Sequence, residues 1–140
     1  MKENFEQSIV FVLRWEGDYS NDPNDTGKET RWGISKRAYP DLDIKNLTIS
    51  QAKEIYKRDY WDKAGCDDLP YPLDIVVFDT AVNMGISRAQ IFLNNAPGRD
   101  WQDVLFQRIN FYSKLAGAKY YLRGWINRVM GLYHLIKQGG

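Results

Sequence analysis

Apolar residues recur every three to four positions along most of the chain, which is the period of an α-helix. The first such segment runs from about residue 4 to Glu16 and ends at Gly17, a residue type that often terminates helices. Five more helical segments follow: one opened by the capping-box pair Thr48 and Gln51 and continuing to about Asp62, one over 73–84, a short one opened by Ser87 and Gln90, one capped by Asp100, and one after Gly117. The pattern therefore predicts an all-α globule.

Only residues 17–33 depart clearly from this pattern. Glycine, proline, asparagine and aspartate crowd the segment, and these residue types favour turns. We expect a long turn-rich loop there, or a short β-hairpin. Loops of this length within a small domain usually serve a function. With 140 residues, 44% of them hydrophobic, the chain suits a single domain over 1–140.

Glu16 stands out because a helical wheel places it in the middle of the apolar stripe that includes Phe5 and Ile9. A carboxyl group that faces the core where a helix meets a loop holds its proton more firmly than one in water. That is the property a general acid needs near neutral pH. The alternative is that Glu16 turns out to solvent or pairs with Arg14 or Arg31.

The loop after Glu16 offers a second group for acid-base chemistry. A glycosidase needs a second carboxylate, or a water molecule held by one. The candidates within reach are Asp18, Asp22, Asp25 and Glu29, with Thr26 and Thr30 beside them. Each aspartate taken singly also fits ordinary turn chemistry.

Aromatic rings near the loop could stack on sugar rings, and Tyr19, Trp32, Tyr60 and Trp61 are placed to do so. Most of the other aromatic residues lie at helical spacing and are more simply explained as core.

The segment over 73–84 is apolar on nearly every side, so it predicts a central buried helix. Asp79 and Asn83 lie four residues apart on one face of it and must find hydrogen-bond partners. They either line a cleft or bond to neighbouring backbone. Arg108, also within an apolar stripe, predicts a buried ion pair, whereas Cys66 and His134 are interpreted as structural or incidental.

The charge balance is uneven along the chain. Residues 1–103 carry 13 Lys and Arg against 18 Asp and Glu, whereas residues 104–140 carry 6 basic residues and no acidic one. A basic C-terminal third suits an anionic surface, although a solvated helix face explains it equally well. One cysteine and one histidine make a metal site a poor interpretation, and no organic cofactor is implied. No stretch is long and apolar enough to span a membrane, and the polar start is not a signal peptide.

Several blocks of sequence, taken in order, resemble the glycoside hydrolase family 108 muramidases. They are Glu16-Gly17-Asp18-Tyr19-Ser20-Asn21-Asp22-Pro23, Thr30-Arg31-Trp32-Gly33-Ile34-Ser35, Asn46-Leu47-Thr48, Gln51-Ala52-Lys53-Glu54-Ile55-Tyr56, Asp59-Tyr60-Trp61-Asp62, Asp79-Thr80-Ala81-Val82-Asn83-Met84-Gly85 and Leu122-Arg123-Gly124-Trp125-Ile126-Asn127-Arg128. The resemblance implies a lysozyme-like helical fold and hydrolysis of the β-1,4 bond between N-acetylmuramic acid and N-acetylglucosamine.

The resemblance also implies roles for residues. The catalytic glutamate of the family ends the first helix and corresponds to Glu16. Related phage-type lysozymes place an aspartate and then a threonine downstream, here Asp25 and Thr30, with Asp22 as a substitute. For sugar binding we choose Tyr19, Trp32 and Asn83, together with Asp79 and Asp22.

The chain departs from the family pattern in two places. Asp18 stands where the family usually has a second glycine, and a peptidoglycan-binding segment expected after Arg99 is missing. Residues 1–85 then carry the catalytic signature, and 86–140 complete the fold. Basic residues after Asp103, such as Arg123 and Arg128, are expected to support contact with the cell wall.

Together these observations predict a monomeric phage or prophage endolysin that acts on bacterial peptidoglycan. It would be made in the host cytoplasm and reach the wall through a holin pore, by export or within a virion. No nucleic acid and no stable membrane insertion are expected. The alternatives are a non-catalytic cell-wall-binding or structural protein with the same fold, and a helical nucleic-acid-binding domain.

Overall fold

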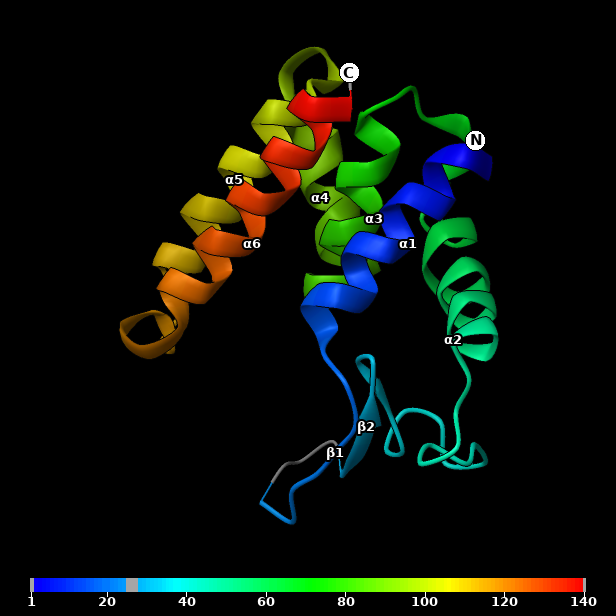
Figure 1. Ribbon diagram of the computed structural model, residues 1–140. Helices are drawn as coiled ribbons and strands as arrows, with labels where there is room; N and C mark the ends of the chain where they lie inside the picture. The colour runs from blue at the N-terminus through cyan, green and yellow to red at the C-terminus, as the bar shows by residue number, and fades with distance from the viewer. Residues whose placement is uncertain (1, 25–27, 140) are drawn as a thin grey trace.

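The computed structural model describes residues 2–24 and 28–139 (Figure 1). Within them the α-helices are α1 (Lys2–Glu16), α2 (Ile49–Tyr56), α3 (Leu73–Met84), α4 (Ile86–Asn95), α5 (Trp101–Ser113) and α6 (Ala118–Gly139). The shorter elements are the π-helix η1 (Lys57–Asp62), the 3-10 helices η2 (Cys66–Asp68) and η3 (Pro97–Arg99), and the strands β1 (Ser20–Asn21), β2 (Glu29–Arg31) and β3 (Ile34–Ser35). The predicted mostly helical fold, with a short β structure after the first helix, is confirmed.

Helix α3 forms the centre of the molecule, as its apolar sequence predicts. Every residue from Leu73 to Ala81 is buried, and α1, α4 and α5 all pack against this helix. Trp61 belongs to the same core, where its ring contacts Phe5 and Phe78 edge to face. Because Trp61 is fully buried, the expectation that it flanks a sugar-binding cleft is wrong.

Two of the predicted helix caps are confirmed and one is wrong. Thr48 and Gln51 form both hydrogen bonds of the capping box that opens α2, and the Asp100 side chain accepts from the Gln102 amide at the start of α5. Ser87, however, lies inside α4, which begins one residue earlier and has Gly85 as its N-cap. Gly85 ends α3 and opens α4 with a positive φ, so the two helices meet at a single residue.

The β structure lies at the end of α1 where Glu16 stands, apart from the helices (Figure 1). Its three antiparallel strands are ordered β1-β2-β3, with Thr30 opposite both Ser20 and Ser35. The candidate residues Asp25 and Thr26 lie outside the described residues.

Helices α5 and α6 form an antiparallel pair whose connecting turn lies far from the two chain ends (Figure 1). Arg128 of α6 is only 6% exposed, so the expectation that it contacts the cell wall is wrong. Arg123 does remain exposed. In the described part of the chain, no helix combines the length and apolar character needed to cross a membrane.

Candidate active site

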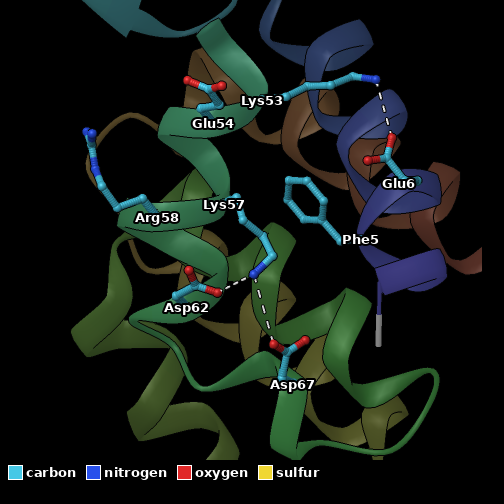
Figure 2. A pocket seen from close by; sticks show the side chains of 8 residues that line it. All are labelled: Phe5, Glu6, Lys53, Glu54, Lys57, Arg58, Asp62 and Asp67. Carbon is cyan, nitrogen blue, oxygen red and sulfur yellow. Dashed lines mark hydrogen bonds and ion pairs between the residues drawn. The ribbon is translucent and has the colours of Figure 1, made fainter. Parts of the chain in front are cut away.

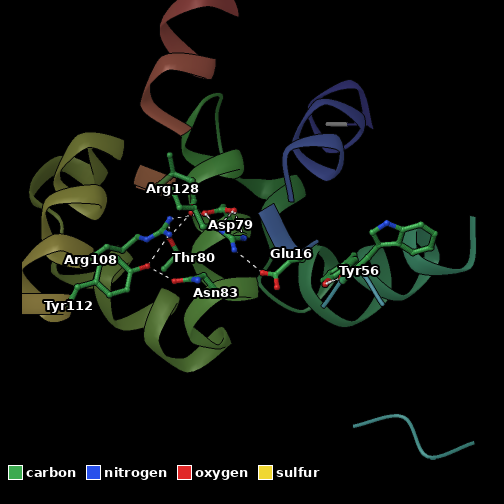
Figure 3. Close-up of polar contacts among 10 residues, drawn as sticks. Glu16, Tyr56, Asp79, Thr80, Asn83, Arg108, Tyr112 and Arg128 are labelled. Carbon is green, nitrogen blue, oxygen red and sulfur yellow. Dashed lines mark hydrogen bonds and ion pairs between the residues drawn. The ribbon is translucent and has the colours of Figure 1, made fainter. Parts of the chain in front are cut away.

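Four charged side chains form a continuous chain of ion pairs across α5, α3, α6 and α1 (Figure 3). Arg108 donates from Nη1 to Asp79 Oδ2 at 2.9 Å. Arg128 lies between two carboxylates, with Nη2 at 2.8 Å from Asp79 Oδ1 and Nη1 at 2.8 Å from Glu16 Oε1. We call Glu16, Asp79, Arg108 and Arg128 the core network.

Asp79 is the anionic centre of the core network. Burial by itself raises the pKa of Asp79, but the charges and hydrogen bonds of Arg128 and Arg108 outweigh it and hold that pKa below its usual range. The predicted buried ion pair of Arg108 is therefore confirmed. The expectation that Asp79 lines a cleft is wrong, because its side chain is fully buried and both oxygens accept from guanidinium groups.

Glu16 is the member of the core network that reaches solvent, with 22% of its side chain exposed. Its ion-pair partner is Arg128 rather than Arg14 or Arg31. The two carboxylate oxygens have different surroundings. Oε1 accepts from Arg128, whereas Oε2 faces Gly33, so closely that a Cβ atom added to Gly33 would lie 2.7 Å from Oε2.

The turn that places Gly33 beside Glu16 joins β2 to β3. Its two residues, Trp32 and Gly33, have φ values of +50° and +80°. Positive φ at both positions is typical of the type I′ turns that close two-residue hairpins. A positive φ at a residue with a side chain costs about 1–2 kcal/mol, and strain of this kind gathers at functional sites.

Tyr56 holds this turn in place. Its hydroxyl donates to the Trp32 carbonyl oxygen at 2.6 Å and would lie 2.6 Å from a Cβ atom added to Gly33. Burial raises the pKa of Tyr56, and the negative charge of Glu16 raises it further, so the hydroxyl keeps the proton that it donates. The turn, α2 and the end of α1 are thereby fixed around one carboxylate.

Other predicted residues lie on the β structure beside this turn. Tyr19 donates its hydroxyl proton to Glu29 at 2.7 Å, and the guanidinium of Arg31 lies 5.1 Å from the Tyr19 ring centre and 5.3 Å from that of Trp32. Arg31 thus joins the two aromatic rings chosen for sugar binding. Thr30 lies in the middle of β2 and is half-buried.

Asp22 is exposed, and its Oδ1 accepts from the Asn24 amide at 2.9 Å. This is the ordinary turn chemistry that the sequence also allowed. Asp25, the other aspartate considered as the second catalytic group, lies outside the described residues.

Asn83 lies one turn beyond Asp79 on α3 and is half-buried. Its side-chain oxygen accepts from the Tyr112 hydroxyl, and Arg108 donates to that same hydroxyl at 3.1 Å. Asn83 is therefore connected to the core network through Tyr112 (Figure 3).

A cavity of about 520 Å³ lies elsewhere, between α1 and the α2–η1 segment (Figure 2). Five of the charged residues that line it are joined by ion pairs and form what we call the surface cluster: Glu6, Lys53, Lys57, Asp62 and Asp67. Lys53 pairs with Glu6, and Lys57 pairs with both Asp62 and Asp67. Glu6 precedes Glu16 by ten residues, about 15 Å along α1, so this cavity is not next to the candidate acid.

Two smaller cavities flank the C-terminal end of α3. One, of about 420 Å³, includes Tyr39, Tyr60 and Gly85. The other, of about 240 Å³, includes Asn83 and Trp125. The site thus has open space on two sides of α3, and burial raises the pKa of Tyr60 on the first side. Among the described residues, no group of three or more potential metal ligands is found.

The sequence profile of the family described as Glycosyl hydrolase 108 matches residues 9–85, more than half of the chain. The chain belongs to glycosyl hydrolase family 108. It is therefore a glycoside hydrolase, and the family implies peptidoglycan as its substrate. The matched segment includes Glu16, the Trp32–Gly33 turn and α3, but it ends before α5 and α6.

The fold of this family 108 member resembles a solved structure of SagA from Brucella abortus. The TM-score is 0.78 at 25% sequence identity, and the alignment covers 94% of this chain and 92% of that one. No curated protein matches the chain in sequence.

Three residues surround Glu16 although the sequence analysis did not predict them there: Arg128, Tyr56 and Gly33. The burial of Arg128 could have been predicted, because it precedes the buried Leu132 and Ile136 by four and eight residues and so lies on the same face of α6. Gly33 belongs to the block of residues 30–35 that resembles family 108, but its contact with Glu16 was not predictable, because the contact joins segments separated by a complete strand pair.

Proposed function

We propose that this family 108 hydrolase is a muramidase in which Glu16 is the general acid. The bond would be the β-1,4 linkage between N-acetylmuramic acid and N-acetylglucosamine. The observation that carries the proposal is the position of Glu16, a partly exposed carboxyl held by Arg128 at the junction of α1 and the β structure. A carboxyl that protonates a glycosidic oxygen must be both oriented and reachable by substrate.

The unequal surroundings of the two Glu16 oxygens support a division of roles. Oε1 accepts from Arg128, so the oxygen that would deliver a proton to the leaving group is Oε2, on the side of Gly33. Because Gly33 has no side chain, the turn can lie directly against Oε2, and a leaving-group oxygen would reach Oε2 from the exposed side of the carboxyl. Proton transfer from Oε2 to that oxygen would break the glycosidic bond and leave an oxocarbenium-like sugar.

The second group comes from the β structure. Asp22, Asp25 and Thr30 remain the candidates that position a water molecule or stabilise the developing positive charge. A separation of about 5–5.5 Å from Glu16 would suit a nucleophilic carboxylate, and about 6.5–9.5 Å would suit a carboxylate that activates water. Tyr19, Trp32 and Asn83 would bind the sugar rings on either side.

We further propose that the protein serves as a phage or prophage endolysin that acts on the cell wall as a monomer. The basic residues that remain exposed near the α5–α6 turn, such as Lys114, Lys119 and Arg123, support contact with an anionic wall.

Digestion of purified peptidoglycan by the wild type and by Glu16→Gln, followed by mass spectrometry of the products, tests the proposal. Wild type should release fragments that end in reducing N-acetylmuramic acid, and Glu16→Gln should lower the rate by about 100-fold or more. Glu6→Gln is the matched control on the same helix and should keep the wild-type rate.

Two outcomes contradict the proposal. Fragments ending in N-acetylglucosamine would assign a different bond, and an active Glu16→Gln variant would remove Glu16 from the chemistry. If no protein releases fragments although all sediment with peptidoglycan, the chain binds the wall without cleaving it.

A further inference from the structure

The cavity of about 240 Å³ lies on the side of α3 that faces the α5–α6 pair, and most of its lining comes from residues beyond the segment matched by the family. Its lining includes Asn83, Arg88 and Trp125. Asn83 follows Asp79 by one helical turn, about 6 Å along α3, so the cavity adjoins the core network. We infer that this cavity and the aromatic rings beyond it bind the glycan strand outside the cleaved bond, with Arg88 contacting a carboxylate that the strand carries. The nature of this ligand rests on the proposed function.

Arg88 is positioned as an anion-binding group. Its guanidinium carbon lies 4.2 Å from the ring centre of Phe111, which holds the planar group against an aromatic face. No ion-pair partner for Arg88 occurs within residues 2–24 and 28–139. A half-buried guanidinium with unpaired N–H donors suits a carboxylate, which it can bind with two parallel hydrogen bonds.

The surroundings of the cavity favour an anionic ligand. Residues 104–140, which supply its far wall, contain no Asp or Glu. No Asp or Glu is among the described residues that line the cavity, and Asp79, one turn before Asn83, is fully buried and paired with two arginines. A strand of N-acetylated sugars with lactyl or peptide carboxylates would meet positive charge here without an opposing negative group.

A series of aromatic rings leads from the core network to solvent. Tyr112 stacks on Trp125 with ring centres 5.1 Å apart, Trp125 contacts Tyr121 at 5.8 Å, and Tyr121 contacts Tyr120 at 6.4 Å. The inner ring is 2% exposed, whereas Tyr121 and Tyr120 are 61% and 76% exposed. Large exposed rings held by a buried neighbour provide flat surfaces for the apolar faces of sugars.

Asn83 connects the two parts of the site. Its oxygen accepts from Tyr112, which fixes the orientation of the amide, and the amide nitrogen donates to no group among the described residues. An acetamido oxygen or a sugar hydroxyl is a suitable acceptor. A glycan strand could therefore extend from Glu16 past Asn83 to the α5–α6 turn.

Binding measurements in the Glu16→Gln protein test this site without cleavage. Two soluble probes of equal length are titrated by calorimetry: peptidoglycan fragments with peptide stems, and chitin oligomers, which have similar rings but no carboxylate. Adding Arg88→Gln should weaken the binding of the peptidoglycan fragments about tenfold, which corresponds to the loss of one charged hydrogen-bonded contact. The affinity for chitin oligomers should stay within about twofold of its value in Glu16→Gln alone. Arg99→Gln is the matched control and should change neither affinity, because Arg99 ends η3, before the start of α5, whereas the cavity lies at the other end of α5.

Replacing Tyr121 with alanine tests the aromatic part of the site. Both probes should bind about five- to tenfold more weakly, since ring stacking does not depend on the carboxylate. Unchanged affinity of the peptidoglycan fragments in Arg88→Gln overturns the inference. An equal loss for both probes in Arg88→Gln also overturns it, because Arg88 would then support the fold rather than recognise an anion.

The same experiments separate this inference from the proposed function. If the wild type cleaves nothing but the Arg88→Gln difference between probes is observed, the binding site stands and the muramidase proposal fails. If the wild type cleaves peptidoglycan and the two probes respond alike, the enzyme stands and this site fails.

Discussion

Helix α1 has a group of charged side chains at each end, and the two groups behave differently. The surface cluster gathers around Glu6, and the core network includes Glu16. Pair distances are similar, 3.3 Å for Lys53–Glu6 and 2.8 Å for Arg128–Glu16. The exposure of the side chains differs, however. The Glu6 side chain is 54% exposed, whereas the Asp79 and Arg108 side chains of the core network are fully buried.

Water explains the difference between the two groups. Exposed ion pairs contribute about 0–1 kcal/mol, because solvent already stabilises both charges. A buried charge left without its partner costs about 3–5 kcal/mol. Pair distance alone therefore does not identify the charges on which a fold depends.

The comparison also bears on the family match. The profile covers residues 9–85, yet Arg108 and Arg128 come from α5 and α6. The helices outside the match thus supply both positive charges of the core network. One of these, Arg128, orients the carboxyl group of Glu16 through its hydrogen bond to Oε1. Residues 86–140 are expected to be indispensable to the site even though they lie beyond the matched segment.

Removing the centre of the core network should have the largest effect. Asp79→Ala leaves two buried guanidinium groups without their shared carboxylate, so the free energy of unfolding should fall by about 3–5 kcal/mol in urea denaturation. Asp62→Ala makes the same chemical change in the surface cluster and should cost about 0.5 kcal/mol or less. Similar losses for the two variants would refute the contrast.

Acid should remove part of the same stabilisation. The folded-state pKa of Asp79 lies below its ordinary value near 4. The paired carboxylate therefore stabilises the fold above about pH 4, and this contribution is lost as the pH falls through the lowered pKa. Between pH 6 and 2, the free energy of unfolding should fall more steeply in wild type than in Asp79→Asn.

Asp59 and Asp67 do not confound this measurement. Their pKa values are also lowered, that of Asp59 to about 2 through its hydrogen bond with Arg58, but both residues are present in both proteins. Their contributions therefore cancel in the difference between the two curves. Parallel curves would mean that Asp79 does not contribute to acid stability.

Sequence patterns predicted the parts of the molecule that depend on local order. The apolar period placed α1, α3 and α6, and the capping residues placed the starts of α2 and α5. The same period singled out Glu16, because a charged residue on an apolar helix face can be recognised from the sequence of that helix alone. The partner of Glu16 was not predictable in this way, since Arg128 is 112 residues away and its pairing depends on how α6 crosses α1.

Close contacts between loops and helices could not be predicted from the sequence either. The Trp32–Gly33 turn, Tyr56 and Glu16 meet only after the β structure has folded back onto α2. Composition did predict a turn-rich segment, but it could not identify which glycine lies against the carboxylate.

Two glycines with similar positive φ angles show how local sequence and spatial contact differ. Gly33 and Gly65 have φ values of +80° and +71°, so alanine at either position pays a similar cost of about 1 kcal/mol for a left-handed conformation. Only at Gly33 would the added methyl group meet Glu16 and Tyr56, whereas nothing lies within 4 Å at Gly65. Gly33→Ala should lower kcat on peptidoglycan at least tenfold, and Gly65→Ala should leave kcat near the wild-type value.

Thermal unfolding of both variants provides the control. Gly65→Ala should lower the unfolding temperature, because alanine there adopts the same left-handed conformation as alanine at Gly33. A fully active Gly33→Ala variant would indicate that the turn can move without disturbing Glu16.

The smallest effect should come from the surface cluster itself. Lys53→Gln removes the ion pair with Glu6, in which the Lys53 and Glu6 side chains are 34% and 54% exposed. The free energy of unfolding should change by less than about 0.5 kcal/mol, and 1 M salt should abolish even that difference because it screens exposed charges. Activity should not change, since this pair lies about 15 Å along α1 from Glu16. A loss of 2 kcal/mol or more that persists in salt would mean that the surface cluster is as strongly coupled as the core network. Exposure would then not be the property that distinguishes the two ends of α1.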